Sequence, residues 1–279
     1  MGVLDRLDRG SQQKLGREEE QCLASRLGSV KPKLASRLIP LLSSGTAEAA
    51  YIEEQLQRKV LDMALIPAGE FQLGSPEGKG EPDEHPRHKV FLDDFLMDKY
   101  PVTVAQYKVF AEAAQRPMRE QPVWNAAGHP VVYVNWDDAR DYCAWQLKQL
   151  PTEAEWEKAT RGGTRTTYSF GDDEKLVGDY AWYIGNSSGT THPVGTKPPN
   201  SYGLYDMMGN VYEWVADWYG EDYYAKSPLR NPAGPAEGRA RVLRGCAWGI
   251  TAYYCRSANR YSSAPQVGYD LRGLRCVSR

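Results

Sequence analysis

The stretch Leu150-Pro151-Thr152-Glu153-Ala154-Glu155-Trp156-Glu157 carries the clearest local signal in the chain. The Thr152 hydroxyl can accept a hydrogen bond from the backbone N–H three residues on, and the Glu155 carboxylate can accept one from the N–H of Thr152. This is the pattern of a capping box. The string therefore predicts that a helix begins here, and it is one of seven strings whose order bears on the fold of residues 63–279.

Other elements are predicted on both sides of this helix. Thr103 stands where a helix N-cap would, with Tyr107 and Phe110 following at helical spacing. A further helix is expected over 137–148. The stretch 66–74 reads as a strand interrupted by a Pro-Ala-Gly turn, and 88–92 alternates like a half-buried strand.

After Arg161 the sequence predicts loops and short strands rich in Gly, Asn, Tyr and Trp. Irregular stretches of this length are uncommon in compact domains unless they are functional or organised by a ligand or metal. The eight Trp and eighteen Tyr of the chain fit both a dense core and a recognition surface.

Residues 1–62 differ in kind and predict an N-terminal helical segment. Strong helix formers dominate it, and Ile52, Leu56 and Val60 recur at helical spacing. We expect a helical cap on the main domain or a dimer contact. The alternative is that these helices bind a partner and the main domain has an accessory or sensing role.

Bulk composition excludes several classes of function. The formal net charge is -2 and no long basic run occurs, which argues against nucleic-acid binding. No run of about 18 apolar residues is present, so no membrane insertion is expected. The first ten residues lack an apolar signal core, and the five cysteines do not form a zinc pattern or a small disulfide scaffold. A cytoplasmic location is expected.

Seven strings in order resemble the formylglycine-generating-enzyme (sulfatase-modifying factor) type of C-type lectin fold. They are 66–71 (IPAGEF), 98–103 (DKYPVT), 129–132 (HPVV), 150–157 (LPTEAEWE), 200–207 (NSYGLYDM), 209–214 (GNVYEW) and 241–245 (RVLRG). The resemblance implies an α+β domain over 63–279 with a small twisted antiparallel sheet, two main helices and long ordered loops.

The catalytic pattern of that family is incomplete here. The resemblance implies a copper(I) site of two cysteines five residues apart, and copper(I) suits two soft thiolates. The first cysteine position holds Ile250 and the second holds Cys255. A related iron-dependent branch uses histidines upstream of the fold, but no histidine precedes His85. The sequence therefore predicts a non-catalytic protein, with a formylglycine-generating-type oxidase, or a degenerate relative of it, as the alternative.

Four cysteines leave further alternatives. Cys246 and Cys255 either meet in space and form some other site or are small buried or variable residues. The resemblance implies that Cys143 and Cys276 are spatial neighbours. In a reducing cytosol we expect buried thiols and not a disulfide.

The turn Gly209-Asn210-Val211-Tyr212-Glu213-Trp214 is a candidate metal site. The resemblance implies calcium held by backbone carbonyls and a carboxylate, with Gly209, Asn210, Val211 and Glu213 as the residues involved, and hard oxygen ligands suit calcium. Alternatively, Asn210 and Glu213 hydrogen-bond the turn beneath Trp214. No other cofactor is expected.

Residues 241–279 resemble the variable region of proteins diversified by a retroelement, in which error-prone copying randomises template adenines. The frame of such regions is matched by Arg241-Val242-Leu243-Arg244-Gly245, Trp248, Cys255-Arg256-Ser257-Ala258-Asn259-Arg260, Pro265 and Gly273-Leu274-Arg275. Arg272 occupies a place that is usually apolar.

Fourteen residues between these fixed positions are predicted to form a variable, ligand-binding surface. They are Gly249, Ile250, Thr251, Tyr253, Tyr254, Tyr261, Ser262, Ser263, Ala264, Val267, Gly268, Tyr269, Asp270 and Leu271. An AAC codon mutated at its adenines cannot encode Lys, Glu, Gln, Met or Trp, and none of these five occurs among the fourteen.

The chemistry of these clusters favours recognition. Tyrosine offers a rigid amphipathic contact at small entropic cost, and Ser, Gly and Thr adapt around it. The alternative is that the tyrosines are half-buried sheet residues. The sequence thus predicts a receptor-like protein that binds a macromolecular ligand, expected to be a protein. It identifies neither that ligand nor the oligomeric state.

Overall fold

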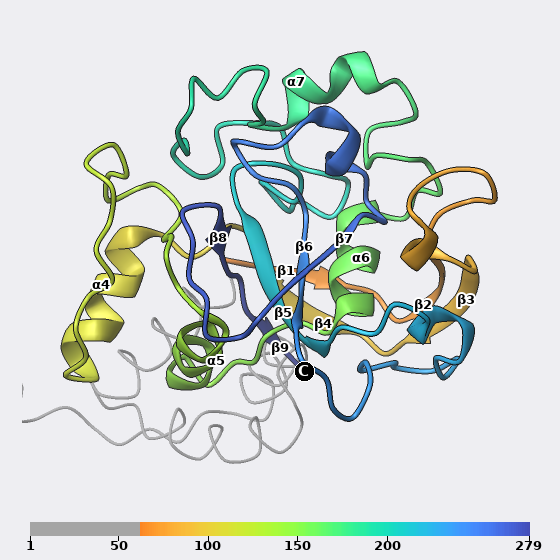
Figure 1. The fold of residues 1–279 in the computed structure, drawn as a ribbon, viewed down its shortest axis with the longest axis horizontal. Coiled ribbons are helices and arrows are strands. Elements are labelled where there is room, and N and C mark those ends of the chain that lie inside the picture. Colours follow the sequence, from red (N-terminus) through yellow and green to blue (C-terminus); the bar gives the residue numbers. More distant parts are fainter. Residues whose placement is uncertain (1–61) are drawn as a thin grey trace, which may run out of the picture. The chain divides into compact units, whose positions relative to one another are not determined.

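The computed structural model describes residues 62–279, and the predicted N-terminal helices lie outside them. Contacts divide the chain into two compact units between Asp62 and Met63. The second unit is an α+β domain of small sheets, short helices and long loops (Figure 1). Within the described part, no helix is long and apolar enough to cross a membrane.

A four-stranded sheet in the order β7-β6-β5-β8 forms the centre of the domain. Its strands pair antiparallel except β5 and β8, which are parallel. A three-stranded sheet has the order β1-β4-β9, and β2 and β3 form a hairpin. The strands are β1 Met63–Ile66, β2 Gly69–Leu73, β3 His88–Leu92, β4 Phe95–Asp98, β5 Tyr212–Trp218, β6 Arg241–Arg244, β7 Arg260–Ser263, β8 Arg272–Gly273 and β9 Val277–Ser278.

The helices flank the central sheet, with α4 and α5 on one side and α6 on the other (Figure 1). The α-helices are α4 Val104–Ala113, α5 Trp136–Trp145, α6 Glu153–Arg161 and α7 Val177–Tyr180. The 3-10 helices are η2 Pro82–Glu84, η3 Glu174–Leu176, η4 Tyr223–Ala225 and η5 Ala252–Cys255. The predicted capping box at Thr152 and Glu155 is confirmed, as is the N-cap at Thr103.

Alternation along β5 and β6 creates two apolar layers. Val215 and Val242 face the cluster around Trp156 of α6. Trp214 and Leu243 face the cluster built with α4 and α5. Successive residues of a strand point to opposite faces of the sheet. In β5 and β6, two adjacent residues therefore contribute one side chain to each layer. These two strands are therefore buried on both faces. They give the C-terminal segment 241–279, called the tail below, a rigid base.

Candidate binding surface

The residues predicted to vary are more accessible than most of the residues between them. Each of the fourteen is exposed or half-buried, while 255–260 and 272–277 are buried throughout. The four predicted contact tyrosines, Tyr253, Tyr254, Tyr261 and Tyr269, keep 40–53% of their surface accessible. The tail thus divides into accessible clusters and a buried frame.

Arg244, at the end of β6, is the central anchor of that frame. Its fully buried guanidinium donates to the Glu157 carboxylate at 2.5 Å. It also donates to the carbonyl oxygens of Ser257 at 3.0 Å and Ala258 at 2.8 Å, and to that of Asn259. One side chain therefore fixes three consecutive peptide units between two accessible clusters.

Two more buried arginines in the tail extend the frame. Arg260 makes a bidentate pair with Glu153 at 2.7 and 2.9 Å. Burial alone would raise the pKa of Glu153, but the charges of Arg260 and Arg244 hold it below its ordinary value. Arg256 donates to Glu84 at 2.6 Å and to the carbonyl of Tyr253 at 2.8 Å. The tail is thereby tied to α6 and to η2.

A pocket of about 500 Å³ lies among the accessible clusters. Predicted residues Ile250, Tyr254 and Tyr261 line it, and Tyr261 stacks on Tyr212 with ring centroids 5.1 Å apart. Tyr253 meets Tyr254 edge-on at 5.1 Å. The remaining lining residues are Glu81, Pro82, Asp83, Tyr219, Glu221, Asn259 and Arg260.

The pocket wall outside the accessible clusters is acidic. Glu81, Asp83 and Glu221 contribute carboxyl groups, and Tyr219 donates to Asp83 at 2.8 Å. The one cation among the lining residues, Arg260, is paired with Glu153. Asn259 is buried, and its amide oxygen has no hydrogen-bond partner among the described residues. The pocket therefore combines tyrosine faces with acidic and acceptor groups.

The other predicted residues continue the surface away from the pocket. Ser262 and Ser263 follow Tyr261 along β7, opposite Val242 and Arg241 of β6. Arg272, at the place that is usually apolar, donates to the carbonyl of Val267 at 2.7 Å and lies over the rings of Trp214 and Tyr269. The Arg272 guanidinium thus holds the loop that follows Ala264, through the Val267 carbonyl and the Tyr269 ring.

Gly268 differs from the other predicted residues. A Cβ atom at this position would lie 2.1 Å from the Tyr133 carbonyl oxygen, whereas one at Gly249 would meet only Leu271, at 3.4 Å. Tyr133, itself exposed, receives no prediction from the sequence, yet its N–H donates to the Tyr269 carbonyl at 3.0 Å. Backbone contact therefore fixes position 268, although it lies on the surface.

The side chains of the predicted calcium site are engaged by other contacts. The Glu213 carboxylate receives a bidentate pair from Arg275 at 2.7 and 2.8 Å and a hydrogen bond from the Trp156 indole at 2.8 Å. The Asn210 side chain exchanges hydrogen bonds with the backbone of His192, both at 3.0 Å. The carbonyls of Gly209 and Asn210 accept from backbone N–H groups of Val211 and Trp248.

Calcium binding at Gly209, Asn210, Val211 and Glu213 stays a prediction, but these contacts compete with it. Arg275 is paired with the carboxylate that calcium would need. The alternative reading, in which Asn210 and Glu213 hydrogen-bond the turn, describes the structure. No group of three or more His, Cys, Asp or Glu residues within 62–279 is arranged to hold a metal ion.

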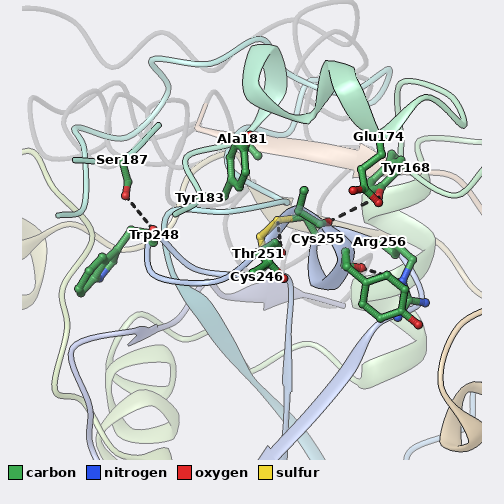
Figure 2. Close-up of a disulfide and its surroundings, with 12 residues drawn as sticks. Tyr168, Glu174, Ala181, Tyr183, Ser187, Cys246, Trp248, Thr251, Cys255 and Arg256 are labelled. Carbon is green, nitrogen blue, oxygen red and sulfur yellow. Dashed lines mark hydrogen bonds between the residues drawn. A yellow bond between two sulfur atoms is a disulfide. The ribbon is translucent and has the colours of Figure 1, made fainter. Parts of the chain in front are cut away.

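The expectation of buried thiols is wrong for Cys143 and Cys276, and the alternative in which Cys246 and Cys255 meet in space describes the structure. Cys143 is bonded to Cys276, and Cys246 is bonded to Cys255. Figure 2 shows the second bond beneath the loop that carries Thr251. Disulfides persist mainly in oxidising compartments, so counting free thiols in the protein isolated from its cell tests the predicted cytoplasmic location.

A family model described as "Sulfatase-modifying factor enzyme 1-like domain" matches residues 48–279. The chain belongs to this family. It is 37% identical to the serine/threonine-protein kinase Pkn1 of Chlamydia caviae, over 87% of this chain and 43% of that protein. It is 33% identical to the formylglycine-generating enzyme of Streptomyces coelicolor, over 79% of this chain and 90% of that protein. The chain thus spans less than half the length of the kinases it matches.

Solved structures of the sulfatase-modifying factor family share the fold. PvdO of Pseudomonas aeruginosa superposes with a TM-score of 0.71 at 32% identity, over 77% of this chain and 93% of that one. Treponema denticola variable protein 1 superposes with a TM-score of 0.69 at 30% identity, over 78% and 94%. The predicted C-type lectin fold of the formylglycine-generating type is confirmed.

Sequence reasoning missed the pocket residues outside the tail. Tyr212 directly precedes Glu213 in a string that was recognised, but both residues are buried, so no alternation in exposure marks Tyr212 as a pocket residue. Glu81 and Asp83 lie in a charged loop about 130 residues before Tyr212 in the sequence, and no local signal links the two segments.

Proposed function

We propose that this protein is a non-catalytic, receptor-like binding protein whose C-terminal surface is diversified by a retroelement to meet changing targets. The observation that carries the proposal is the division of the tail into fourteen accessible residues and a buried frame between them. Substitution at accessible positions other than Gly268 costs little stability, whereas substitution in a buried hydrogen-bonded frame costs much.

The ligand is expected to be a macromolecule, and a protein in particular. Half-exposed tyrosines around a pocket, with small residues beside them, match the composition of recognition loops. The similarity to a protein named variable protein 1 supports the same proposal. The surface carries no fixed ligand signature, because residues that vary cannot encode one target.

The test is a comparison of DNA sequences around the gene. We expect an imperfect repeat of codons 241–279 that differs from the gene at template adenines, with differences at the accessible clusters and none at Arg244, Arg256 or Arg260. A reverse transcriptase gene is expected nearby. A locus with neither, or with differences scattered over the frame codons, would refute diversification.

A second candidate function is an oxidase of the formylglycine-generating type, favoured by the family and by the similarity to the Streptomyces coelicolor enzyme. Against it, Ile250 stands at the first thiol position, and the sulfur of Cys255 is bonded to Cys246. Stoichiometric copper(I) binding by the purified protein, with turnover of a cysteine-containing peptide, would favour the oxidase and exclude the non-catalytic proposal.

A further inference from the structure

The loop 247–254 carries five of the predicted contact residues and little secondary structure. It begins after β6 and ends in η5, and Ile250 and Tyr254 provide one wall of the pocket. Two of its backbone hydrogen bonds reach other segments, from Trp248 N–H to the Asn210 carbonyl and from Ile184 N–H to the Ile250 carbonyl. Strand pairing does not hold this loop.

The Cys246–Cys255 disulfide closes the loop at its two ends. Both cysteines are fully buried, and they share an apolar cluster with Tyr168, Val177, Ala181 and Met208 (Figure 2). The Ser187 hydroxyl donates to the Trp248 carbonyl at 2.7 Å, and Figure 2 shows this contact at the far side of the loop from η5. The covalent bond thus joins the loop's two ends beneath its exposed side chains, in addition to the hydrogen bonds from Arg244 to the carbonyls of Ser257 and Ala258.

The frame outside the loop has its own anchors. Arg244 and Arg260 are bound by Glu157 and Glu153 of α6, and the second disulfide joins Cys143 of α5 to Cys276 in the last segment. These anchors do not depend on the Cys246–Cys255 bond. We therefore expect the loss of this bond to affect the loop first.

We propose that the Cys246–Cys255 disulfide positions the binding loop, so that the surface is preorganised only in the oxidised protein. That this loop binds a ligand rests on the proposed function. Reduction by a dithiol breaks the S–S bond. The reductant gives up two electrons and two protons and becomes a cyclic disulfide, and Cys246 and Cys255 become thiols. The loop then opens more often and presents Ile250 and Tyr254 in many arrangements, which raises the entropic cost of binding.

The test compares two double variants of the full chain by hydrogen–deuterium exchange. Cys246→Ala with Cys255→Ala should speed amide exchange in 247–255 by up to about 100-fold, the effect of releasing a closed loop of about ten residues. Chymotrypsin should then cut first after the exposed Tyr253 or Tyr254. Cys143→Ala with Cys276→Ala removes the other buried disulfide and should leave exchange in 247–255 unchanged.

Equal exchange in 247–255 with and without the bond would overturn the proposal, as would faster exchange spread evenly over the domain. If the Ala variant does not fold, the wild-type chain is treated with dithiothreitol and alkylated. Exchange in 247–255 should rise in step with labelling of Cys246 and Cys255. Labelling without reductant would show that the bond is absent and would also overturn the proposal. None of these readouts uses a ligand or the gene's neighbours, so failure here is distinct from failure of the proposed function.

Discussion

Replacing Arg244 by methionine should be among the most damaging single changes in the tail, although no accessible residue is altered. The substitution keeps an unbranched but shorter side chain and removes its charge and donors. The Glu157 oxygen that Arg244 binds loses its cation, although Arg161 still pairs with the other oxygen at 2.8 Å. The carbonyls of Ser257, Ala258 and Asn259 lose their donor inside the protein.

The magnitude follows from these losses. Removing one partner of a buried ion pair costs about 3–5 kcal/mol. Each stranded carbonyl adds about 1 kcal/mol, with overlap because one side chain serves all of them. We expect the free energy of unfolding to fall by about 5 kcal/mol. For a domain of this size, the melting temperature should fall by roughly 10–20 °C.

Urea unfolding of the full chain, followed by tryptophan fluorescence, measures the loss. The matched control is Arg230→Met, because Arg230 pairs with Asp93 at the surface, where the side chains are 63% and 56% exposed. An exposed pair contributes about 0–1 kcal/mol. If Arg244→Met costs no more than Arg230→Met, the carbonyl anchor does not stabilise the frame, and the division into frame and variable surface loses its physical basis.

Three further outcomes are expected. Glu213→Gln leaves Arg275 without its counter-charge and should lower the free energy of unfolding by about 3–5 kcal/mol. Calcium should not change the melting temperature of the wild type. Stabilisation by calcium would contradict the pairing of Glu213 with Arg275. Burial raises the pKa of Asp206 to about 6, so the folded state binds the proton more tightly than the unfolded state and stability should fall as pH rises from about 4 to 6. Asp206→Asn should remove that part of the slope in unfolding curves taken across this range, and an unchanged slope would exclude Asp206 as its source. Gly268→Ala should cost about 1–3 kcal/mol because its Cβ meets the Tyr133 carbonyl, while Gly249→Ala should be nearly neutral; equal melting temperatures would mean that the 268 backbone shifts freely.

Local hydrogen bonding made much of the fold predictable. Helix starts at Thr103 and Thr152 depend on side chains three residues apart, so the sequence contains both partners of each contact. The accessible clusters are also separated by frame strings that the sequence shows directly. That separation indicates that the fourteen residues are at least partly accessible, as the structure has them, although their variation and their binding of a ligand stay predictions.

Long-range partners explain what the sequence did not reveal. The family resemblance implies calcium at Glu213, and nothing near Glu213 marks Arg275, 62 residues away, as its partner. The thiol state of Cys143 and Cys276 follows from an expected compartment and not from geometry, and the Cys246–Cys255 bond depends on a turn that brings two separated residues together. The pocket combines the tail with a distant charged loop.

The partners of Arg244 also determine what kind of change the surface can accept. Main-chain carbonyls are the same for every amino acid, so the arginine binds three positions in the chain whatever side chains they carry. A deleted or inserted residue within 245–259 would change which carbonyl groups lie within hydrogen-bonding distance of the Arg244 guanidinium. Repertoires built on this scaffold should therefore differ in residue identity at constant loop length, whereas antibody loops also change in length.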